Sequence, residues 1–240
     1  MRQPQAQLVI LTMNGSLQNH TPTFIVFPVK TGKVRCEIHN ATAAKALVIT
    51  TMGSASYRRH PFTAKLSESL ASKGITNVLA DLLTPEEFAE HRYRFDGEKI
   101  SARLRLLVKY LRSLPEYRTI PFGLFGGGTG AEGALTAAAR MPREIQALVC
   151  MDGLRGMEQS PLDNIFCPTL LIAHNNDTEN PSTHEQTESR LKSWCMLEKM
   201  RGGNNEPLHP EVDSITGWFR QFLLTRGKRM FQTQPLAIHA

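Results

Sequence analysis

Short apolar segments alternate with amphipathic segments along most of this chain, and this alternation constrains the fold more than any other feature. The segments expected to form strands are 46–50, 76–81, 122–125, 147–151 and 169–173. Helical spacing of apolar residues is found at 61–73, 98–114, 131–140, 184–195 and 212–224. Strands that are apolar along their whole length are buried on both faces, which is typical of a parallel sheet covered by helices on both sides. The pattern predicts a doubly wound α/β fold, with 34–38 as a half-exposed edge strand.

Length and composition fit a single domain of this kind. Of the 240 residues, 41% are hydrophobic and 21% are charged, which supplies a sizeable core and excludes a disordered chain. We expect a peripheral N-terminal segment at 1–22, one domain at 23–226 and a C-terminal tail at 227–240. The apolar run Leu8–Leu11 is too short for a secretory signal, and no run is long enough to span a membrane. The expectation is therefore a cytoplasmic protein with no membrane partner.

Cysteine usage and charge argue against several partner classes. The cysteines, which show no paired spacing, are Cys36, Cys150, Cys167 and Cys195. We therefore expect reduced thiols, no metal site and no cofactor. The net charge of +6 is spread along the chain and is not interleaved with aromatic residues, so we expect no nucleic-acid partner. Glu86 and Glu87 follow Pro85, where carboxylates complement a helix dipole more simply than they form an acid–base pair.

The most informative segment is the glycine-rich turn between the strand at 122–125 and the helix at 131–140. It reads Gly126-Gly127-Gly128-Thr129-Gly130. Such a turn can bind a phosphate at the helix N-terminus, form a nucleophile elbow of the G-x-S-x-G type, or carry no chemistry. A P-loop is excluded because no lysine follows the glycines. The elbow frame fits except that glycine stands at 128 in place of serine, and the residues alone leave the three alternatives open.

Further segments connect this turn to a known family. Met52–Ser56 is similar to an HGSGSS-type oxyanion loop, 81–87 reads DLLTPEE, and 121–126 and 167–172 match two strand segments. On these segments, the stretch from about Leu47 to Leu224 resembles the dienelactone-hydrolase-like branch of the α/β-hydrolase superfamily. The resemblance implies an α/β-hydrolase fold, with a mostly parallel central sheet, helices on both faces and no large lid. It also implies acyl chemistry by Ser, Asp and His in that chain order, with backbone N–H groups that hold the oxyanion.

Two of the three catalytic side chains of that family are absent from the matching positions. The nucleophile position holds Gly128, the acid position holds Asp177, and the base position holds Asn205. An amide cannot replace an imidazole as the base, because it has no usable pKa near neutrality. Loss of the nucleophile or the base of a triad costs nearly as much turnover as loss of the whole triad, about a millionfold. The resemblance thus implies that the family frame is retained without its usual reaction.

The same resemblance implies a pocket at the carboxyl ends of the strands. Beside the three triad positions, its expected ligand-binding residues are Met52, Gly53, Ser54 and Thr129. Met52 stands where such loops often carry histidine, whereas Gly53 keeps a backbone donor. The N–H of Thr129 is the second expected donor.

Other side chains could take over the missing roles, and each also has a simpler role. Thr129 is expected to cap the following helix rather than act as a nucleophile. His209 could reach Asp177 if its loop were shifted, although an exposed loop histidine before a helix is the simpler interpretation. His174 could line the pocket mouth or only form a hydrogen bond in its turn. Cys150 ends a strand and is expected to be a buried structural thiol.

Two functions follow from these residues. The leading hypothesis is a catalytically degenerate hydrolase homologue, a pseudoenzyme that binds a small carbonyl or carboxylate ligand or acts as a scaffold. The alternative is an active ester or lactone hydrolase that uses a non-standard nucleophile or water activated by Asp177. Neither the oligomeric state nor the ligand identity is indicated by any motif.

Overall fold

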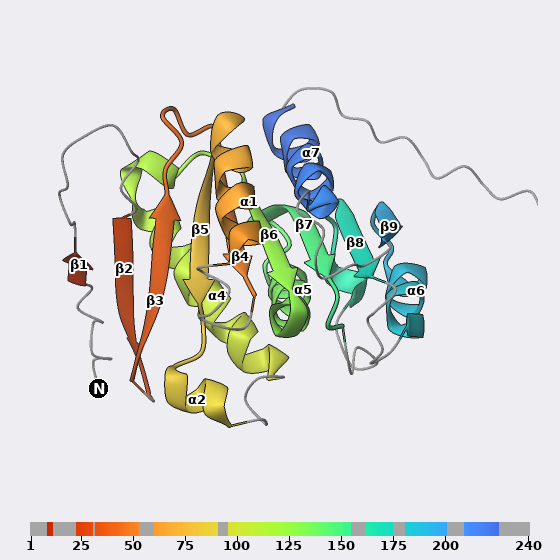
Figure 1. Cartoon of the computed structure of the whole chain (residues 1–240), viewed down its shortest axis with the longest axis horizontal. Helices are drawn as coiled ribbons and strands as arrows, with labels where there is room; N and C mark the ends of the chain where they lie inside the picture. Colours follow the sequence, from red (N-terminus) through yellow and green to blue (C-terminus); the bar gives the residue numbers. More distant parts are fainter. Residues whose placement is uncertain are drawn as a thin grey trace, which may run out of the picture.

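The computed structural model of the chain describes residues 9–11, 23–30, 32–52, 60–90, 96–154, 162–174, 181–200 and 209–225. Over these residues, nine strands form one open sheet in the order β1-β2-β3-β5-β4-β6-β7-β8-β9 (Figure 1). From β5 to β9 in this order, all neighbouring strands are parallel, whereas the three N-terminal strands are joined by antiparallel pairing. The predicted mostly parallel sheet is confirmed.

The parallel part contains the strands that the apolar segments predicted. They are β4 (Ala46–Thr51), β5 (Ile75–Asp81), β6 (Phe122–Gly127), β7 (Ile145–Met151) and β8 (Thr169–His174). Every residue of β4 and β6 is buried, because helices cover the sheet on both sides. Side chains alternate between the two covered faces along each strand, so Leu124 joins one core cluster and Phe125 joins the other.

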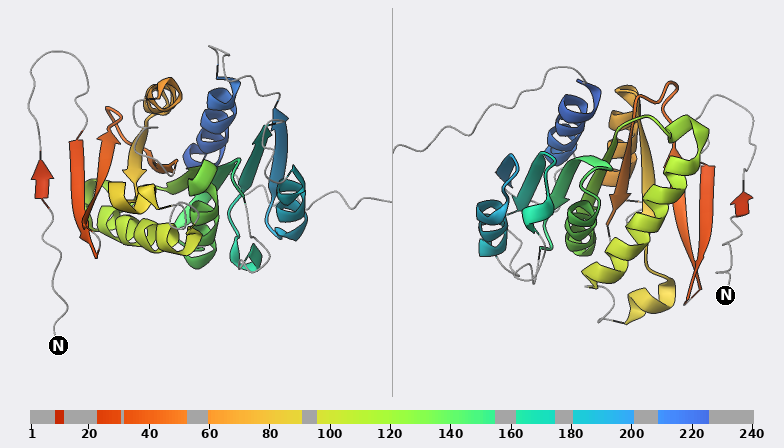
Figure 2. Two further views of the ribbon diagram at one scale, coloured as in Figure 1. Left: turned by 60° about the horizontal axis from the view of Figure 1, so that its bottom comes forward. Right: turned by 180° about the vertical axis from the view of Figure 1, so that it is seen from behind.

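Helices form a layer on each face of the sheet. Helices α1 (Pro61–Ser72) and α7 (Pro210–Leu224) cover one face, and α4 (Gly97–Ser113) and α5 (Ala131–Arg140) cover the other (Figure 2). The cluster under α1 and α7 contains Phe62 and Phe219, and the cluster under α4 and α5 contains Leu104. Two further helices, α2 (Pro85–Ala89) and α6 (Pro181–Arg190), lie beside this core. The predicted α/β class, with helices on both faces, is therefore correct.

The prediction of an edge strand at 34–38 is wrong. These residues belong to β3 (Gly32–His39), which lies between β2 (Thr23–Val29) and β5 inside the sheet. Beyond β2, the short strand β1 (Val9–Leu11) extends the sheet further and lies within the segment predicted to be peripheral. Pro28 disfavours a strand assignment for β2 from sequence. The sequence pattern therefore does not predict the strand that pairs with β3 on its outer side.

The predicted helix at 184–195 is wrong at both ends. Helix α6 begins at Pro181 and ends at Arg190, and Cys195 starts the last strand, β9 (Cys195–Met200). Among the described strands, β9 pairs with β8 alone, and it is partly exposed along its length. An edge strand needs no continuous apolar run, because one of its sides faces solvent, and a search for such runs therefore passes over it.

Glu87 has a larger role than a charge at a helix terminus. It forms a capping box with Thr84 at the start of α2, as its position suggested, but its side chain is buried. Its carboxylate accepts from Arg103 on α4, with Nη2 to Oε1 at 2.8 Å, and pairs with Lys99 at 3.2 Å. Arg103 also donates to the carbonyl of Leu82 and is itself buried, so it is not part of a solvated basic surface.

Strands β4, β6, β7 and β8 all end at the same carboxyl edge of the parallel part, which is where ligands bind in sheets of this kind. In the part of the chain that the structure describes, no large lid covers this edge. Within that same part, no helix is both long and apolar enough to cross a membrane.

Candidate functional site

The glycine-rich turn after β6 forms the centre of the candidate site. Strand β6 ends at Gly127, a single 3-10 turn spans Gly128–Gly130, and α5 begins directly at Ala131. Gly128 has φ +52°, in the left-handed region that side-chain-bearing residues rarely adopt. A Cβ atom placed on Gly128 would meet no heavy atom of the described residues within 4 Å. Among these residues, nothing packs against the apex of the turn.

The two flanking glycines are fixed by packing instead. A Cβ atom on Gly126 would lie 2.7 Å from Ala131 Cα and Ala134 Cβ, and one on Gly130 would collide with the carbonyl oxygen of Thr51. Only glycine fits at these two positions without a shift of the backbone. This is the frame of a nucleophile elbow, in which small residues flank a strained central position between strand and helix. The strained apex is present, and the nucleophilic side chain is not.

Met52 closes one side of the turn. It directly follows β4, its side chain is buried, and its Sδ and Cε atoms occupy the space where a side chain on Gly127 would lie. Its predicted place beside the elbow is therefore supported by contact, although the thioether offers only a weak acceptor.

The prediction that Thr129 caps the following helix is wrong. The N-cap of α5 is Gly130, and no side-chain hydrogen bond caps that helix. A 3-10 turn precedes α5, so the helix begins after Thr129. Thr129 lies within this turn and is half-buried. The hydroxyl of Thr129 thus lies one residue from the open apex and outside the helix-capping position.

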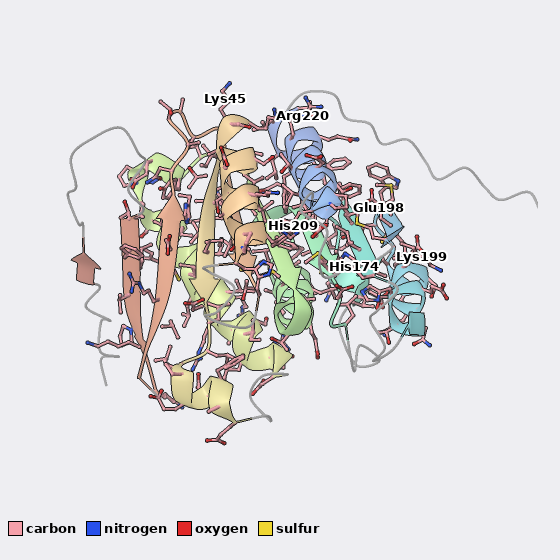
Figure 3. The ribbon with its side chains drawn as sticks, viewed as in Figure 1. Lys45, His174, Glu198, Lys199, His209 and Arg220 are labelled. Atoms are coloured by element: carbon pink, nitrogen blue, oxygen red, sulfur yellow. The ribbon has the colours of Figure 1, made fainter. Side chains whose placement is uncertain are left out.

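A second polar feature lies beside the elbow, at the ends of β7 and β8. Asp152 follows β7. His174, labelled in Figure 3, is the last residue of β8. The Oδ2 atom of Asp152 lies 2.7 Å from His174 Nδ1, and its Oδ1 atom accepts from the His174 backbone N–H at 2.9 Å. Next to Asp152, Gly153 packs against the elbow so closely that a Cβ there would lie 2.7 Å from Gly128 Cα.

Sequence reasoning raised His174 as a pocket residue but did not find its partner. The signal was available, because Asp152 and His174 each come at the end of a buried strand. Strands β7 and β8 are parallel neighbours with Met151 paired to Ile172, so their ends emerge side by side. The contact between Asp152 and His174 can be predicted only once β7 and β8 are known to be neighbours in the sheet.

A third group of polar residues surrounds the N-terminus of α7. His209 precedes Pro210, the first residue of that helix, and has φ +39° (Figure 3). Its Nδ1 atom lies 3.2 Å from Oε1 of Glu211, and its ring packs edge-on against His60 and Phe62. The predicted position before a helix-starting proline is confirmed, but the ring is mostly buried and not an exposed loop side chain.

Comparisons with known proteins agree with this geometry. A dienelactone hydrolase from Anabaena variabilis superposes with a TM-score of 0.73 at 27% identity, covering 85% of this chain and 100% of that one. The chain has the dienelactone-hydrolase-like α/β-hydrolase fold. An esterase from an Arctic intertidal metagenomic library (TM-score 0.68, 13% identity) and an α/β serine hydrolase without lid from Xanthomonas campestris (TM-score 0.61, 17% identity) share this fold. They cover 89% and 86% of this chain, and 100% and 95% of their own chains.

A protein of Mycobacterium tuberculosis that is named as a phosphoribosyl transferase is 30% identical to this chain over 188 residues, in each of two strains. The match covers 76% of this chain but only 42% of that protein, so the chain spans less than half the length of these relatives. No protein-family model matches the chain.

The thiols of this hydrolase-fold chain do not supply a replacement nucleophile. All four cysteines are free. Cys150 has no exposed surface, its Sγ lies 3.7 Å from the carbonyl of Ala131, and burial raises its pKa well above the ordinary value. Burial likewise raises the pKa of Cys167 and of Cys195 to about 12. A thiol attacks as its thiolate, so these side chains are structural, as predicted for Cys150.

Several predicted site residues lie outside the described residues. These are Gly53, Ser54, Asp177 and Asn205. The acid and base positions of the hydrolase frame therefore stay predictions. Among the residues that the structure describes, no three His, Cys, Asp or Glu side chains come together in a group that could hold a metal ion.

Proposed function

We propose that this chain is a hydrolase homologue that binds a small carbonyl or carboxylate ligand at its elbow and forms no covalent acyl-enzyme. The observation that carries the proposal is the open apex at Gly128. Its positive φ supports an elbow backbone, and no atom of the described residues fills the space that a serine side chain would occupy, which leaves that space to a ligand.

Backbone N–H donors make the space at the Gly128 apex suitable for a ligand oxygen. In elbows of this fold, the N–H of the residue after the apex is one of the two donors that hold an oxyanion. That residue is Thr129, in a turn whose backbone is held by Gly126 and Gly130. Because the apex carries no hydroxyl, a ligand oxygen can approach these donors directly.

Other nucleophiles at the site have less support. Cys150 is fully buried with a raised pKa, and Thr129 is one residue away from the strained apex position that presents a nucleophile in an elbow. A hydrolase that uses a non-standard nucleophile is therefore the weaker alternative. The transferase activity named for the M. tuberculosis relatives is not part of the proposal, because this chain spans 42% of their length.

Covalent labelling tests the absence of an acyl-enzyme. The full chain is treated with a fluorophosphonate probe, and its intact mass is measured. We expect no adduct on the natural chain and an adduct on the Gly128→Ser/Asn205→His double variant, which restores the two missing family side chains. An adduct on any residue of the natural chain would contradict the proposal.

Thermal shift tests ligand binding. Butyrate, as a small carboxylate probe at about a hundredfold above its dissociation constant, should stabilise the native chain by about 2.7 kcal/mol and raise the Tm. Gly128→Val fills the apex space and should abolish the shift. Gly217→Ala is the matched control, because Gly217 lies on α7 with no atom of the described residues within 4 Å of its would-be Cβ. No shift for the natural chain would count against the ligand class.

A further inference from the structure

Strand β9 ends the sheet and has one side that faces away from β8, here called its outer side. It pairs with β8 in parallel and comes last in the strand order (Figure 1). In the part of the chain that the structure describes, no strand pairs with the outer side. An uncovered strand edge presents unpaired N–H and C=O groups to which another chain can add a strand. The sequence of β9 contains no proline, which would block such pairing.

The pairing with β8 identifies the backbone groups on the outer side. The carbonyl of Trp194 accepts from the N–H of Thr169 on β8 at 2.9 Å. Because backbone polar groups point to alternate sides along a strand, the even-numbered residues of β9 also direct theirs to β8. The remaining residues direct their N–H and C=O groups to the outer side: Cys195, Leu197 and Lys199.

Exposed apolar side chains lie along the same strand. Trp194, directly before β9, is 49% exposed, and Met196 is 37% exposed. Trp194 stacks on Trp218 of α7 with ring centroids 5.2 Å apart, and Phe222 packs against both rings. Tryptophan and methionine are enriched where proteins contact one another. The outer side of β9 therefore lies beside an apolar surface of the kind that interfaces bury.

The charges on the opposite face of β9 are arranged so that two copies of the strand complement each other. Lys199, labelled in Figure 3, pairs with Glu185 of α6, so α6 covers the face that carries Lys199. Burial, and after it the negative charge of Glu188, raises the pKa of the Cys195 thiol to about 12, which places Glu188 near the first residue of β9. The strand thus carries a lysine near one end and lies beside a carboxylate at the other. In an antiparallel copy, each lysine meets the other carboxylate.

We infer that a second copy of this chain binds to the outer side of β9 and forms a two-fold dimer through an antiparallel β9–β9 pair. A two-fold axis needs one self-complementary surface, which an antiparallel strand pair supplies. The outward N–H groups at positions 195, 197 and 199 then each bind a carbonyl of the second copy. The inference does not depend on what the elbow binds.

Charge selects the register of this pair. A two-fold axis through a residue places that residue opposite its own copy, where equal charges repel, so neither Glu198 nor Lys199 is central. Leu197 is the middle one of the three outward residues, and an axis there pairs all three within β9. Glu198 then lies opposite Met196 of the second copy, and Lys199 lies opposite Cys195.

This register also accounts for the other features of the strand. Lys199 of each copy comes close to Glu188 of the other copy, because Glu188 lies beside Cys195. Trp194 lies opposite Met200, whose thioether makes favourable contacts with an aromatic ring. The exposed indole of Trp194 is thereby covered.

Sedimentation velocity of the full chain over a range of concentrations tests the inference. We expect a monomer–dimer equilibrium that responds to charge at Met196. Met196→Lys and Met196→Glu remove the same apolar side chain, but a lysine faces Glu198 of the second copy with opposite charge and a glutamate faces it with equal charge. Each dimer contains two such pairs, so the dissociation constant of Met196→Glu should be about tenfold above that of Met196→Lys.

A charge swap at the ends of the strand keeps the test open if substitution at Met196 prevents folding, which circular dichroism monitors. Lys199→Glu should weaken the dimer by placing equal charges beside Glu188, and Glu188→Lys added to it should restore the affinity. Arg140→Glu is the matched control. It reverses a charge in an exposed ion pair with Glu98, between α5 and α4, and should leave the dissociation constant unchanged.

Amide hydrogen exchange supplies a readout specific to this strand pair. The amides of Leu197 and Lys199 should become protected only at concentrations where the dimer forms. The amide of Met196 faces β8 and should be protected at every concentration.

Three outcomes would overturn the inference. A chain that stays monomeric at every concentration has no such dimer, and equal dissociation constants for Met196→Lys and Met196→Glu contradict the register. Protection of Leu197 and Lys199 in the monomer would mean that another segment of the same chain covers the outer side. None of these outcomes bears on ligand binding at the elbow, which is measured with butyrate.

Discussion

Alanine substitutions in the elbow test why glycine is needed at each position. Packing requires glycine at 130, whereas only the backbone angle φ favours it at 128. At Gly128, a methyl group meets no atom of the described residues, so the cost comes from φ +52° and is about 1–2 kcal/mol. Loss of chain entropy in the unfolded state offsets about 0.4–1 kcal/mol of this. Gly128→Ala should therefore destabilise by about 1 kcal/mol, which is a fall in Tm of about 2–4 °C for a chain of this size.

Gly130→Ala should be clearly worse. Its methyl group would overlap the carbonyl oxygen of Thr51, which is backbone and cannot rotate away. Overpacking of this kind costs about 3 kcal/mol or more, or a fall in Tm of about 6 °C or more. Gly217→Ala on α7 provides the control in open space and should stabilise by about 0.5–1 kcal/mol.

Urea denaturation followed by circular dichroism measures all three variants on one scale. The expected order of stability is Gly217→Ala above the natural chain, then Gly128→Ala, then Gly130→Ala. Equal losses for Gly128→Ala and Gly130→Ala would refute the reasoning, because they would mean that the apex is as tightly packed as its flank. A small loss of stability for Gly128→Ala, a larger loss for Gly130→Ala and none for Gly217→Ala would support an apex with room for a ligand.

Two further predictions concern groups away from the elbow. Glu87→Gln leaves Arg103 buried without its anionic partner, so urea denaturation should show a loss of about 3–5 kcal/mol; a loss below 1 kcal/mol would contradict this role of the pair. Burial raises the pKa of Tyr117 to about 12, so above about pH 10 the unfolded chain releases this proton first, and the urea midpoint should fall between pH 10 and 12. Tyr117→Phe, which cannot ionise, should show a smaller fall over the same range.

The fold could be predicted largely because each buried strand carries its own signal. Uniformly apolar runs such as 46–49 are buried on both faces wherever they lie in the sheet, so no partner has to be known. Strand β9 lacks this signal, since its edge position tolerates the charged residues Glu198 and Lys199. Strand β1 is only three residues long, and Pro28 interrupts the apolar run of β2. Their assignment depends on pairing across the sheet, which a local pattern does not contain.

The candidate site also has a part that the sequence predicts and a part that depends on the fold. The elbow at 126–130 is local, and its strand–glycine–helix order is visible in the sequence, although the extra 3-10 turn that displaces Thr129 from the helix cap is not. The Asp152–His174 pair joins residues 22 apart, and the Glu87–Arg103 pair joins residues 16 apart. Both depend on which elements are neighbours in the fold.

Packing explains how this elbow keeps its shape without a nucleophile. Gly126 and Gly130 are required by contacts with α5 and β4, so any chain that places this strand and helix together needs them whatever chemistry follows. The apex position makes no such contact with the described residues, so a side chain there is not needed to hold this backbone. The elbow backbone therefore keeps its shape with glycine at 128. Serine attack requires an apex hydroxyl, whereas the proposed ligand binding requires only the backbone donors.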